Sequence, residues 1–96
     1  MPSLVWTRQA QLDLARLYSF LAPKSKSAAN RAVRTIQRDL KILENHPEIG
    51  RPVPELLPEY REWFIEFGHG GYVALYYYNN SQVFILELSH GREAGY

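Results

Sequence analysis

The spacing of apolar residues predicts a first helix between Thr7 and Pro23. Its apolar stripe is formed by Ala10, Leu14, Leu17, Tyr18 and Leu21. The side-chain oxygen of Thr7 can cap the helix N-terminus, and Pro23 prevents the helix from continuing. The remaining positions are mostly polar: Arg8, Gln9, Asp13, Arg16 and Ser19. Leu12 falls among these polar residues, so we expect it either to be exposed or to contact a partner.

A second helix is predicted from Ser25 or Ser27, either of which can cap it, up to Pro47. Its apolar stripe contains Ala29, Ala32, Val33, Ile36, Leu40 and Leu43. Basic residues line the opposite side at helical spacing: Arg31, Arg34, Arg38 and Lys41. This basic face is either an ordinary solvated helix surface or a docking surface for an acidic partner segment or a phosphate backbone.

Three runs of aromatic and β-branched residues follow, YREWFIEF, YVALYYY and VFILELSHGRE, joined by GHGG and NNS. This pattern predicts an antiparallel meander. In the first run Trp63, Ile65 and Phe67 should face the core, because Glu62 and Glu66 share the other face. In the last run we expect Phe84, Leu86 and Leu88 to share a face and to alternate with Glu87.

The tyrosines of the central run, Tyr72, Tyr76 and Tyr78, are either core rings or functional groups with a hydroxyl at the rim. Residues 3–6 are a candidate for a brief edge strand. Residues 47–59 hold Pro47, Pro52, Pro54 and Pro58, so we expect a stiff irregular connection rather than a strand or helix. Its apolar residues Ile49, Val53, Leu56 and Leu57 should fix it to the core.

These elements predict an α+β fold in which an N-terminal helical hairpin packs on a three- to four-stranded antiparallel sheet. Residues 1–96 should form a single domain. The 46% hydrophobic content is typical of a globular chain, and cysteine is absent, which excludes disulfides and thiolate chemistry.

His46, His69 and His90 do not share a metal-ligand spacing, so we expect no metal and no cofactor. The sequence MPSLVWTRQ contains no run typical of a signal peptide, and no apolar stretch is long enough to cross a membrane. We therefore expect a soluble cytoplasmic protein with no membrane partner.

No nucleophile–base motif, P-loop or dinucleotide fingerprint is visible. What remains is a set of polar residues at strand ends: Tyr60, Arg61, His90, Arg92, Glu93 and Tyr96. Such residues can bind and cleave RNA, with arginine stabilising charge at phosphorus and histidine or tyrosine moving a proton. They can equally form a salt-bridged tail.

The order of the segments is more specific than any one of them. WTRQAQLDLARLYSFL, AANRAVRTIQRDLKILENHPEIGRP, YREW, GYVALYYY and HGREAGY follow one another along nearly the whole chain. In this order they resemble the RelE/ParE family of type II toxin–antitoxin toxins. The resemblance implies a bacterial toxin that a segment of a cognate antitoxin wraps and neutralises. Residues Leu12, Arg31, Arg34, Arg38 and Lys41 are the candidates for antitoxin binding.

Within this family the resemblance is closer to the ParE, or plasmid stabilization, branch, whose members are associated with inhibition of DNA gyrase. The RelE-like branch instead cleaves mRNA on the ribosome and would use Arg61, His90, Arg92 and Tyr96 as catalytic candidates. Val73 and Trp63 stand where a RelE-like nuclease would place basic residues, and the long hairpin also looks ParE-like. We therefore expect a gyrase inhibitor. The alternatives are a RelE-like endonuclease and a degenerate, non-toxic interaction module.

Overall fold

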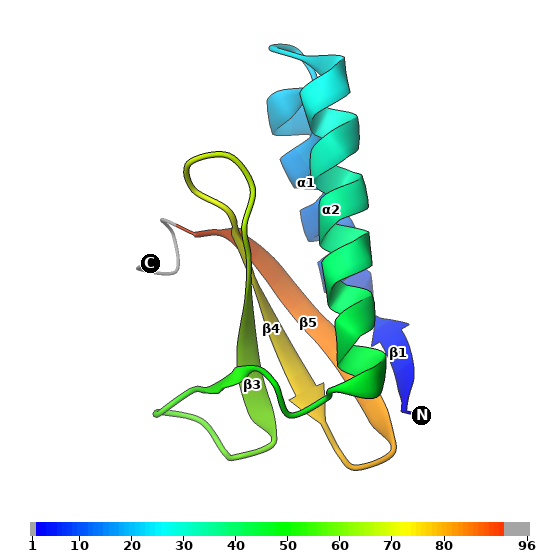
Figure 1. The fold of residues 1–96 in the computed structure, drawn as a ribbon, viewed down its shortest axis with the longest axis vertical. Helices are drawn as coiled ribbons and strands as arrows, with labels where there is room; N and C mark the ends of the chain where they lie inside the picture. Colours follow the sequence, from blue (N-terminus) through cyan, green and yellow to red (C-terminus); the bar gives the residue numbers. More distant parts are fainter. Residues whose placement is uncertain (1, 92–96) are drawn as a thin grey trace.

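A computed structural model describes residues 2–91 of the chain. Two long helices lie against one face of a five-stranded sheet and extend past one end of its central strands (Figure 1). The elements are β1 (Ser3–Trp6), α1 (Arg8–Leu21), α2 (Lys26–Asn45), β2 (Arg51–Pro52), β3 (Tyr60–Ile65), β4 (Tyr72–Tyr78) and β5 (Gln82–His90). The strand order across the sheet is β1-β5-β4-β3-β2. The α+β class and the helical hairpin are confirmed.

The sheet differs from the prediction in its strand number and in the direction of one strand. The predicted edge strand β1 forms, but it pairs with β5 in parallel, from Ser3 with Gln82 to Trp6 with Ile85. Parallel neighbours need a long crossover connection, which the helical hairpin begins. At the other edge, Arg51 and Pro52 pair with β3, where an irregular connection was expected. Proline is tolerated there because an edge strand has one side without a neighbour.

Both helices begin where the sequence predicts. The Thr7 hydroxyl accepts from the N–H of Ala10 at 3.2 Å and donates to the carbonyl of Ile85 at 2.6 Å. It therefore caps α1 and also ties the helix start to β5. The Ser25 hydroxyl caps α2 by accepting from the N–H of Ala28 at 3.1 Å. Pro23 lies in the turn between the helices.

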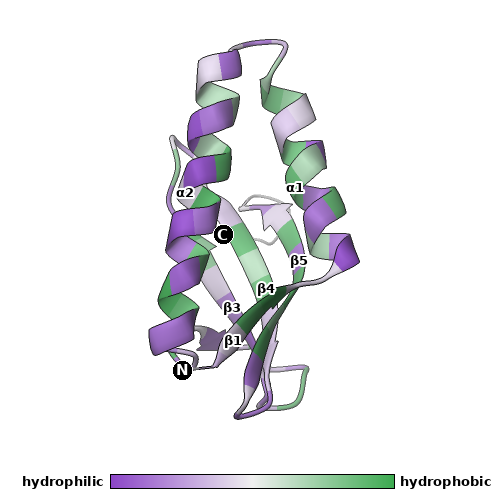
Figure 2. Ribbon diagram, turned by 90° about the vertical axis from the view of Figure 1, so that its right-hand side faces the viewer, coloured by the Kyte–Doolittle hydropathy of each residue, from purple (hydrophilic) through white to green (hydrophobic). Residues whose placement is uncertain are grey.

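The core forms between the helical hairpin and the sheet face that it covers. Its fully buried large side chains are Ile36, Leu40, Leu43, Ile65, Tyr76, Val83, Ile85 and Leu88. Trp63 and Phe67 pack against this cluster, which confirms the predicted inward face of β3. Hydrophilic residues follow the outer side of α2 (Figure 2). Leu12 is exposed, which is one of the two outcomes that we expected for it.

The prediction that Phe84, Leu86 and Leu88 share one face of β5 is wrong for Phe84 and Leu86. Tyr76 pairs with Ile85 while Leu75 pairs with Glu87, so Leu86 has no partner on β4 and forms a β-bulge. A bulge shifts the alternation by one residue. Consequently Val83 and Ile85 face the core before the bulge and Leu88 faces it after the bulge, whereas Phe84 and Leu86 are only partly buried.

Asp13 is buried, although the sequence placed it on the polar side of the first helix. One carboxylate oxygen accepts from the N–H of Leu88 at 3.0 Å, and the other accepts from the Gln9 amide at 2.8 Å. The pairing of β1 with β5 ends at Ile85, so the N–H of Leu88 has no partner on β1. The Asp13 side chain of α1 accepts its hydrogen bond instead.

The connection between α2 and β3 is fixed by hydrogen bonds rather than by its apolar residues. Ile49, Leu56 and Leu57 are exposed, so the predicted apolar anchors are wrong for these three. Instead the buried Tyr76 hydroxyl donates to the carbonyl of Pro47 at 2.8 Å and accepts from the N–H of Gly50 at 2.9 Å. A side chain at position 50 would collide with the Tyr76 ring, so glycine permits this close approach.

Candidate functional site

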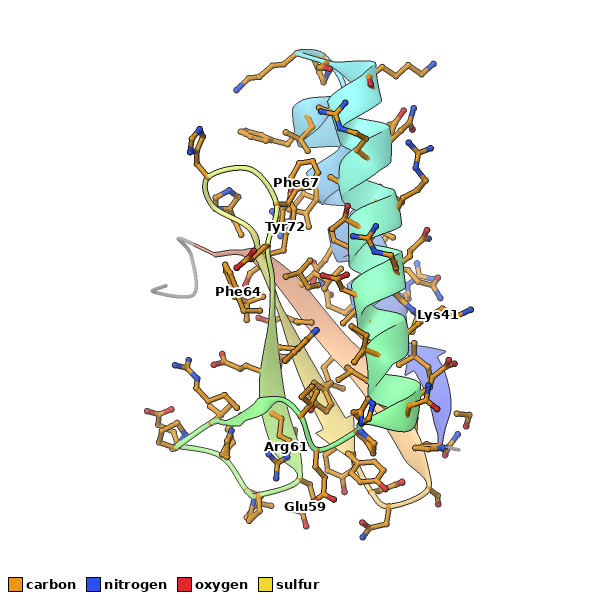
Figure 3. All side chains as sticks on the ribbon, in the orientation of Figure 1. Lys41, Glu59, Arg61, Phe64, Phe67 and Tyr72 are labelled. Carbon is orange, nitrogen blue, oxygen red and sulfur yellow. The ribbon has the colours of Figure 1, made fainter. Side chains whose placement is uncertain are left out.

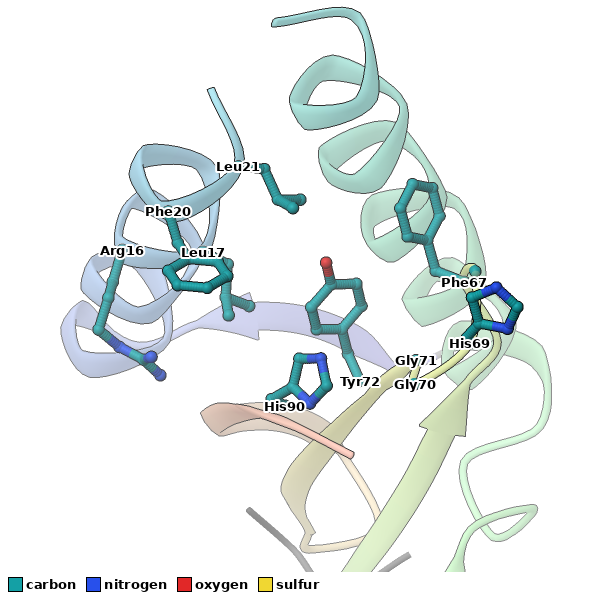
Figure 4. Close-up of a pocket in the computed structure, with 11 residues that line it drawn as sticks. Arg16, Leu17, Phe20, Leu21, Phe67, His69, Gly70, Gly71, Tyr72 and His90 are labelled. Atoms are coloured by element: carbon teal, nitrogen blue, oxygen red, sulfur yellow. The ribbon is translucent and has the colours of Figure 1, made fainter. Parts of the chain in front are cut away.

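A cleft of about 750 Å³ opens between α1 and the loop that joins β3 to β4 (Figure 4). Leu17, Phe20 and Leu21 contribute from the helix side, and the segment from Phe67 to Tyr72 contributes from the sheet side. The polar groups of the cleft are on Arg16, His69, Tyr72 and His90. Its walls are therefore largely apolar, with basic and imidazole nitrogens at intervals, and no acidic side chain of residues 2–91 lines it.

Two aromatic contacts position the polar groups in this cleft. The Tyr72 and His90 rings meet edge to face, with centroids 5.8 Å apart and an interplanar angle of 82°. The Phe67 and Tyr72 rings are tilted relative to each other, with centroids 6.0 Å apart. Burial raises the pKa of the Tyr72 hydroxyl above its ordinary value, so at neutral pH the group keeps its proton. It can donate a hydrogen bond to a ligand but cannot act as an anionic base there.

Arg16 is a cleft residue that the sequence pattern did not reveal. Its guanidinium Nη2 lies 3.4 Å from the carbonyl oxygen of Leu88, to which it donates. The helical wheel placed Arg16 on the polar side, and only the packing of α1 beside β5 brings it to the cleft. Leu12, Arg16 and Phe20 follow one another at four-residue spacing, so they share one face of α1.

Arg61, the predicted cation of a nuclease site, lies near the opposite end of the sheet from His90. Arg61 pairs with Tyr76 on β4 while His90 pairs with Tyr72. A strand rises about 3.3 Å per residue, so the two candidates are on the order of 13 Å apart along the strands. The Arg61 Nη1 donates to the carbonyls of Gly50 at 2.8 Å and Glu48 at 3.1 Å, and Figure 3 shows the side chain beside that loop.

The other two catalytic candidates, Arg92 and Tyr96, lie outside the described residues, as does Glu93. Tyr60 is on β3, where its ring meets that of Tyr77. The structure therefore places only His90 of the described nuclease candidates in the cleft.

The predicted antitoxin-binding residues form two separate surfaces. Arg31, Arg34, Arg38 and Lys41 are all exposed on α2. Arg31 donates to the Ser27 hydroxyl at 3.0 Å, and Arg38 meets Asp39 at 3.4 Å in a pair whose arginine side chain is 75% exposed. Such an exposed pair contributes little to stability and leaves the stripe basic. Leu12, 52% exposed, belongs instead to the α1 face that leads to Phe20, itself 65% exposed.

The family described as "ParE toxin of type II toxin-antitoxin system, parDE" matches residues 4–95 of the chain. The chain belongs to the ParE toxin family. It is also 31% identical to a Caulobacter vibrioides protein named "Toxin RelE3" over 93 residues, which cover 97% of this chain and 98% of that protein. A solved structure titled "Chromosomal ParDE TA system from P. aeruginosa" has a TM-score of 0.77 and 26% identity, over 94% of this chain and 96% of the solved one.

Membership of the ParE family makes the protein a toxin of a type II toxin–antitoxin system and implies a cognate antitoxin as its partner. The two positions at which the sequence departs from a RelE-like nuclease are occupied by packed apolar side chains. Val73 is only 3% exposed, and Trp63 packs against the core. The buried indole N–H of Trp63 has no hydrogen-bond partner among residues 2–91. Neither position can present a cation to RNA.

Residues 2–91 contain no cluster of three or more histidine, cysteine, aspartate or glutamate side chains that could hold a metal ion. Neither helix in this part of the ParE-family chain is long and apolar enough to cross a membrane.

Proposed function

We propose that this ParE-family toxin acts by inhibiting DNA gyrase and that binding of its cognate antitoxin neutralises it. The observation that carries the proposal is the position of Arg61. Its guanidinium is held by the carbonyls of Glu48 and Gly50, far along the sheet from His90. Ribonuclease chemistry needs a cation and a proton carrier on the same phosphate, and this separation prevents Arg61 and His90 from serving together in that way. The toxin would act in the cytoplasm, where gyrase and the chromosome are.

Two exposed surfaces support antitoxin binding. The basic stripe of Arg31, Arg34, Arg38 and Lys41 would attract an acidic segment. The cleft beside Phe20 offers apolar walls to a buried side chain of that segment. A segment that folds on binding can cover both surfaces at once, and such extensive burial is compatible with nanomolar or tighter affinity.

The RelE-like alternative has one specific observation in its favour. Arg16, Tyr72 and His90 bring a cation, a hydroxyl donor and an imidazole into a single cleft. The similarity to a protein named "Toxin RelE3" points the same way. In that mechanism Arg16 would bind the phosphate and His90 would move the proton. A non-toxic interaction module is the third alternative, and it predicts no growth arrest on induction.

Induction of the toxin in cells separates these functions. The gyrase mechanism predicts stalled replication and DNA damage first, with translation failing later and with mRNA intact soon after induction. Primer extension on mRNA at that early time is the test. Codon-positioned cuts that disappear in an Arg16→Ala, His90→Ala variant would overturn the proposal in favour of the nuclease. An Arg34→Ala variant is the matched control, because Arg34 is exposed on the outer side of α2.

A further inference from the structure

The sheet face away from the helices carries a row of aromatic rings across three strands. Tyr60 pairs with Tyr77, Tyr77 pairs with Phe84, and Phe84 pairs with Val5 on β1. Directly paired residues have side chains on the same face. The neighbouring row of Arg61, Tyr76, Ile85 and Trp6 faces the helices, so the aromatic row lies on the face that the two helices leave uncovered. We call this surface the open face.

The rings of the open face contact one another. The Tyr60 and Tyr77 rings meet edge to face with centroids 5.0 Å apart. The Tyr77 and Phe84 rings are tilted relative to each other, with centroids 6.4 Å apart. All three side chains are partly exposed. Tyrosine is enriched at protein interfaces, where it supplies a large contact area with little loss of conformational freedom. Their mutual packing restricts the orientations of these rings, so less conformational freedom is lost when a partner binds.

The charges beside the aromatic row are mainly acidic. In the next row of the open face Glu62 pairs with Leu75, and Leu75 pairs with Glu87. Glu62 is neutralised in part by Arg51 at 2.7 Å, while Glu87 is exposed at the other side of the row. Carboxylates in these positions repel a phosphate backbone and an acidic antitoxin segment alike, and they attract arginine and lysine.

We propose that the open face, through the row Tyr60, Tyr77 and Phe84 with Glu87 beside it, docks on a basic DNA-contacting surface of gyrase. The proposal rests on gyrase being the target. An enzyme that binds DNA presents clustered lysine and arginine to it. An arginine of that surface can stack on a tyrosine ring and pair with an adjacent carboxylate. The toxin would then occupy the surface that gyrase uses for DNA, while the basic α2 stripe remains available to an antitoxin.

Supercoiling by purified gyrase, measured against toxin concentration, tests this assignment. Tyr77→Ala and Glu87→Lys should each raise the toxin concentration for half-inhibition at least about tenfold, as expected for a central aromatic and for a reversed charge in an interface. Glu44→Lys is the matched control, because it makes the same charge change on α2, and it should inhibit as wild type does. Thermal melting of each variant verifies the fold.

The possible outcomes separate this inference from the proposed function. If wild-type toxin inhibits and both open-face variants inhibit equally well, the open face is not the gyrase surface and gyrase remains the target. If wild-type toxin does not inhibit gyrase, both proposals are wrong. If Tyr77→Ala converts a dimer to a monomer in sedimentation without weakening inhibition, the open face joins two copies of the chain instead, and the inference fails.

Discussion

The Tyr76 hydroxyl donates a hydrogen bond to the carbonyl of Pro47, 2.8 Å away and 29 residues earlier in the chain. The same hydroxyl accepts from the N–H of Gly50. This central-strand tyrosine is therefore the tie that fixes the proline-rich connection to the sheet. Its role is structural, one of the two interpretations that the sequence allowed for it.

Tyr76→Phe should lower the free energy of unfolding by about 1–3 kcal/mol, because it leaves a buried backbone donor and an acceptor without their partner. Tyr77→Phe, the next residue of β4 but on the open face, should change it by less than about 0.5 kcal/mol. Urea unfolding of both variants measures the difference. Equal losses in the two variants would show that the Tyr76 hydroxyl bonds contribute nothing specific.

Stability should fall at alkaline pH. Burial raises the pKa of Tyr76, although its Gly50 hydrogen bond and Arg61 act against this, and burial also raises the pKa of Tyr72. At pH values above 10.0, the ordinary pKa, the unfolded chain loses these protons while the folded chain keeps them. The contribution of these protons to the free energy of unfolding is therefore fully present well below pH 10.0 and is lost as the pH rises from there through the folded pKa values. Urea unfolding at about pH 8 and pH 11 should show a smaller decline in the Tyr72→Phe, Tyr76→Phe variant. An unchanged decline would contradict this origin.

Arg61→Ala should destabilise the fold, since its guanidinium donates to Gly50 and Glu48. A hydrogen bond from a charged group contributes about 1.5–3 kcal/mol to stability. We expect a loss at the lower end of this range, because Arg61 is partly exposed and solvent weakens its interactions. Arg34→Ala on α2 is the matched control and should cost less than about 0.5 kcal/mol. Thermal melting of both variants is the measurement. A stable Arg61→Ala variant that has nonetheless lost toxicity would indicate a direct functional role for Arg61.

Leu40 is fully buried in the interface of α2 with the sheet. Leu40→Ala should cost about 2–5 kcal/mol through lost burial and the cavity left behind. Chemical denaturation that ranks this variant above Arg34→Ala in stability would mean that the two helix faces are assigned wrongly.

The helices were predictable because their determinants are local. The apolar period, the caps Thr7 and Ser25 and the prolines all act within a few residues of the helix ends. The parallel pairing of β1 was not predictable, because its partner Gln82–Ile85 lies at the far end of the sequence. The bulge at Leu86 likewise depends on how β5 aligns with β4, and alternation alone does not reveal it.

The cleft was predictable only in part. His90 was singled out from its position at a strand end, and it lies in the cleft. Arg16 and Asp13 looked like solvated helix positions, and their contacts with Leu88 arise only when α1 packs beside β5. Arg61 was recognisable as a cation opening a strand, but its engagement with the loop at Gly50 depends on the folded position of that loop.

Inhibition of gyrase by the purified toxin tests the central claim most directly. Gyrase supercoiling of relaxed plasmid should fall as wild-type toxin is added and should recover when the antitoxin, identified as the small acidic protein that co-purifies with the toxin, is supplied in excess. Translating ribosomes given the same toxin should keep their mRNA intact. Full supercoiling at every toxin concentration, together with cleavage of ribosome-bound mRNA, would contradict the account.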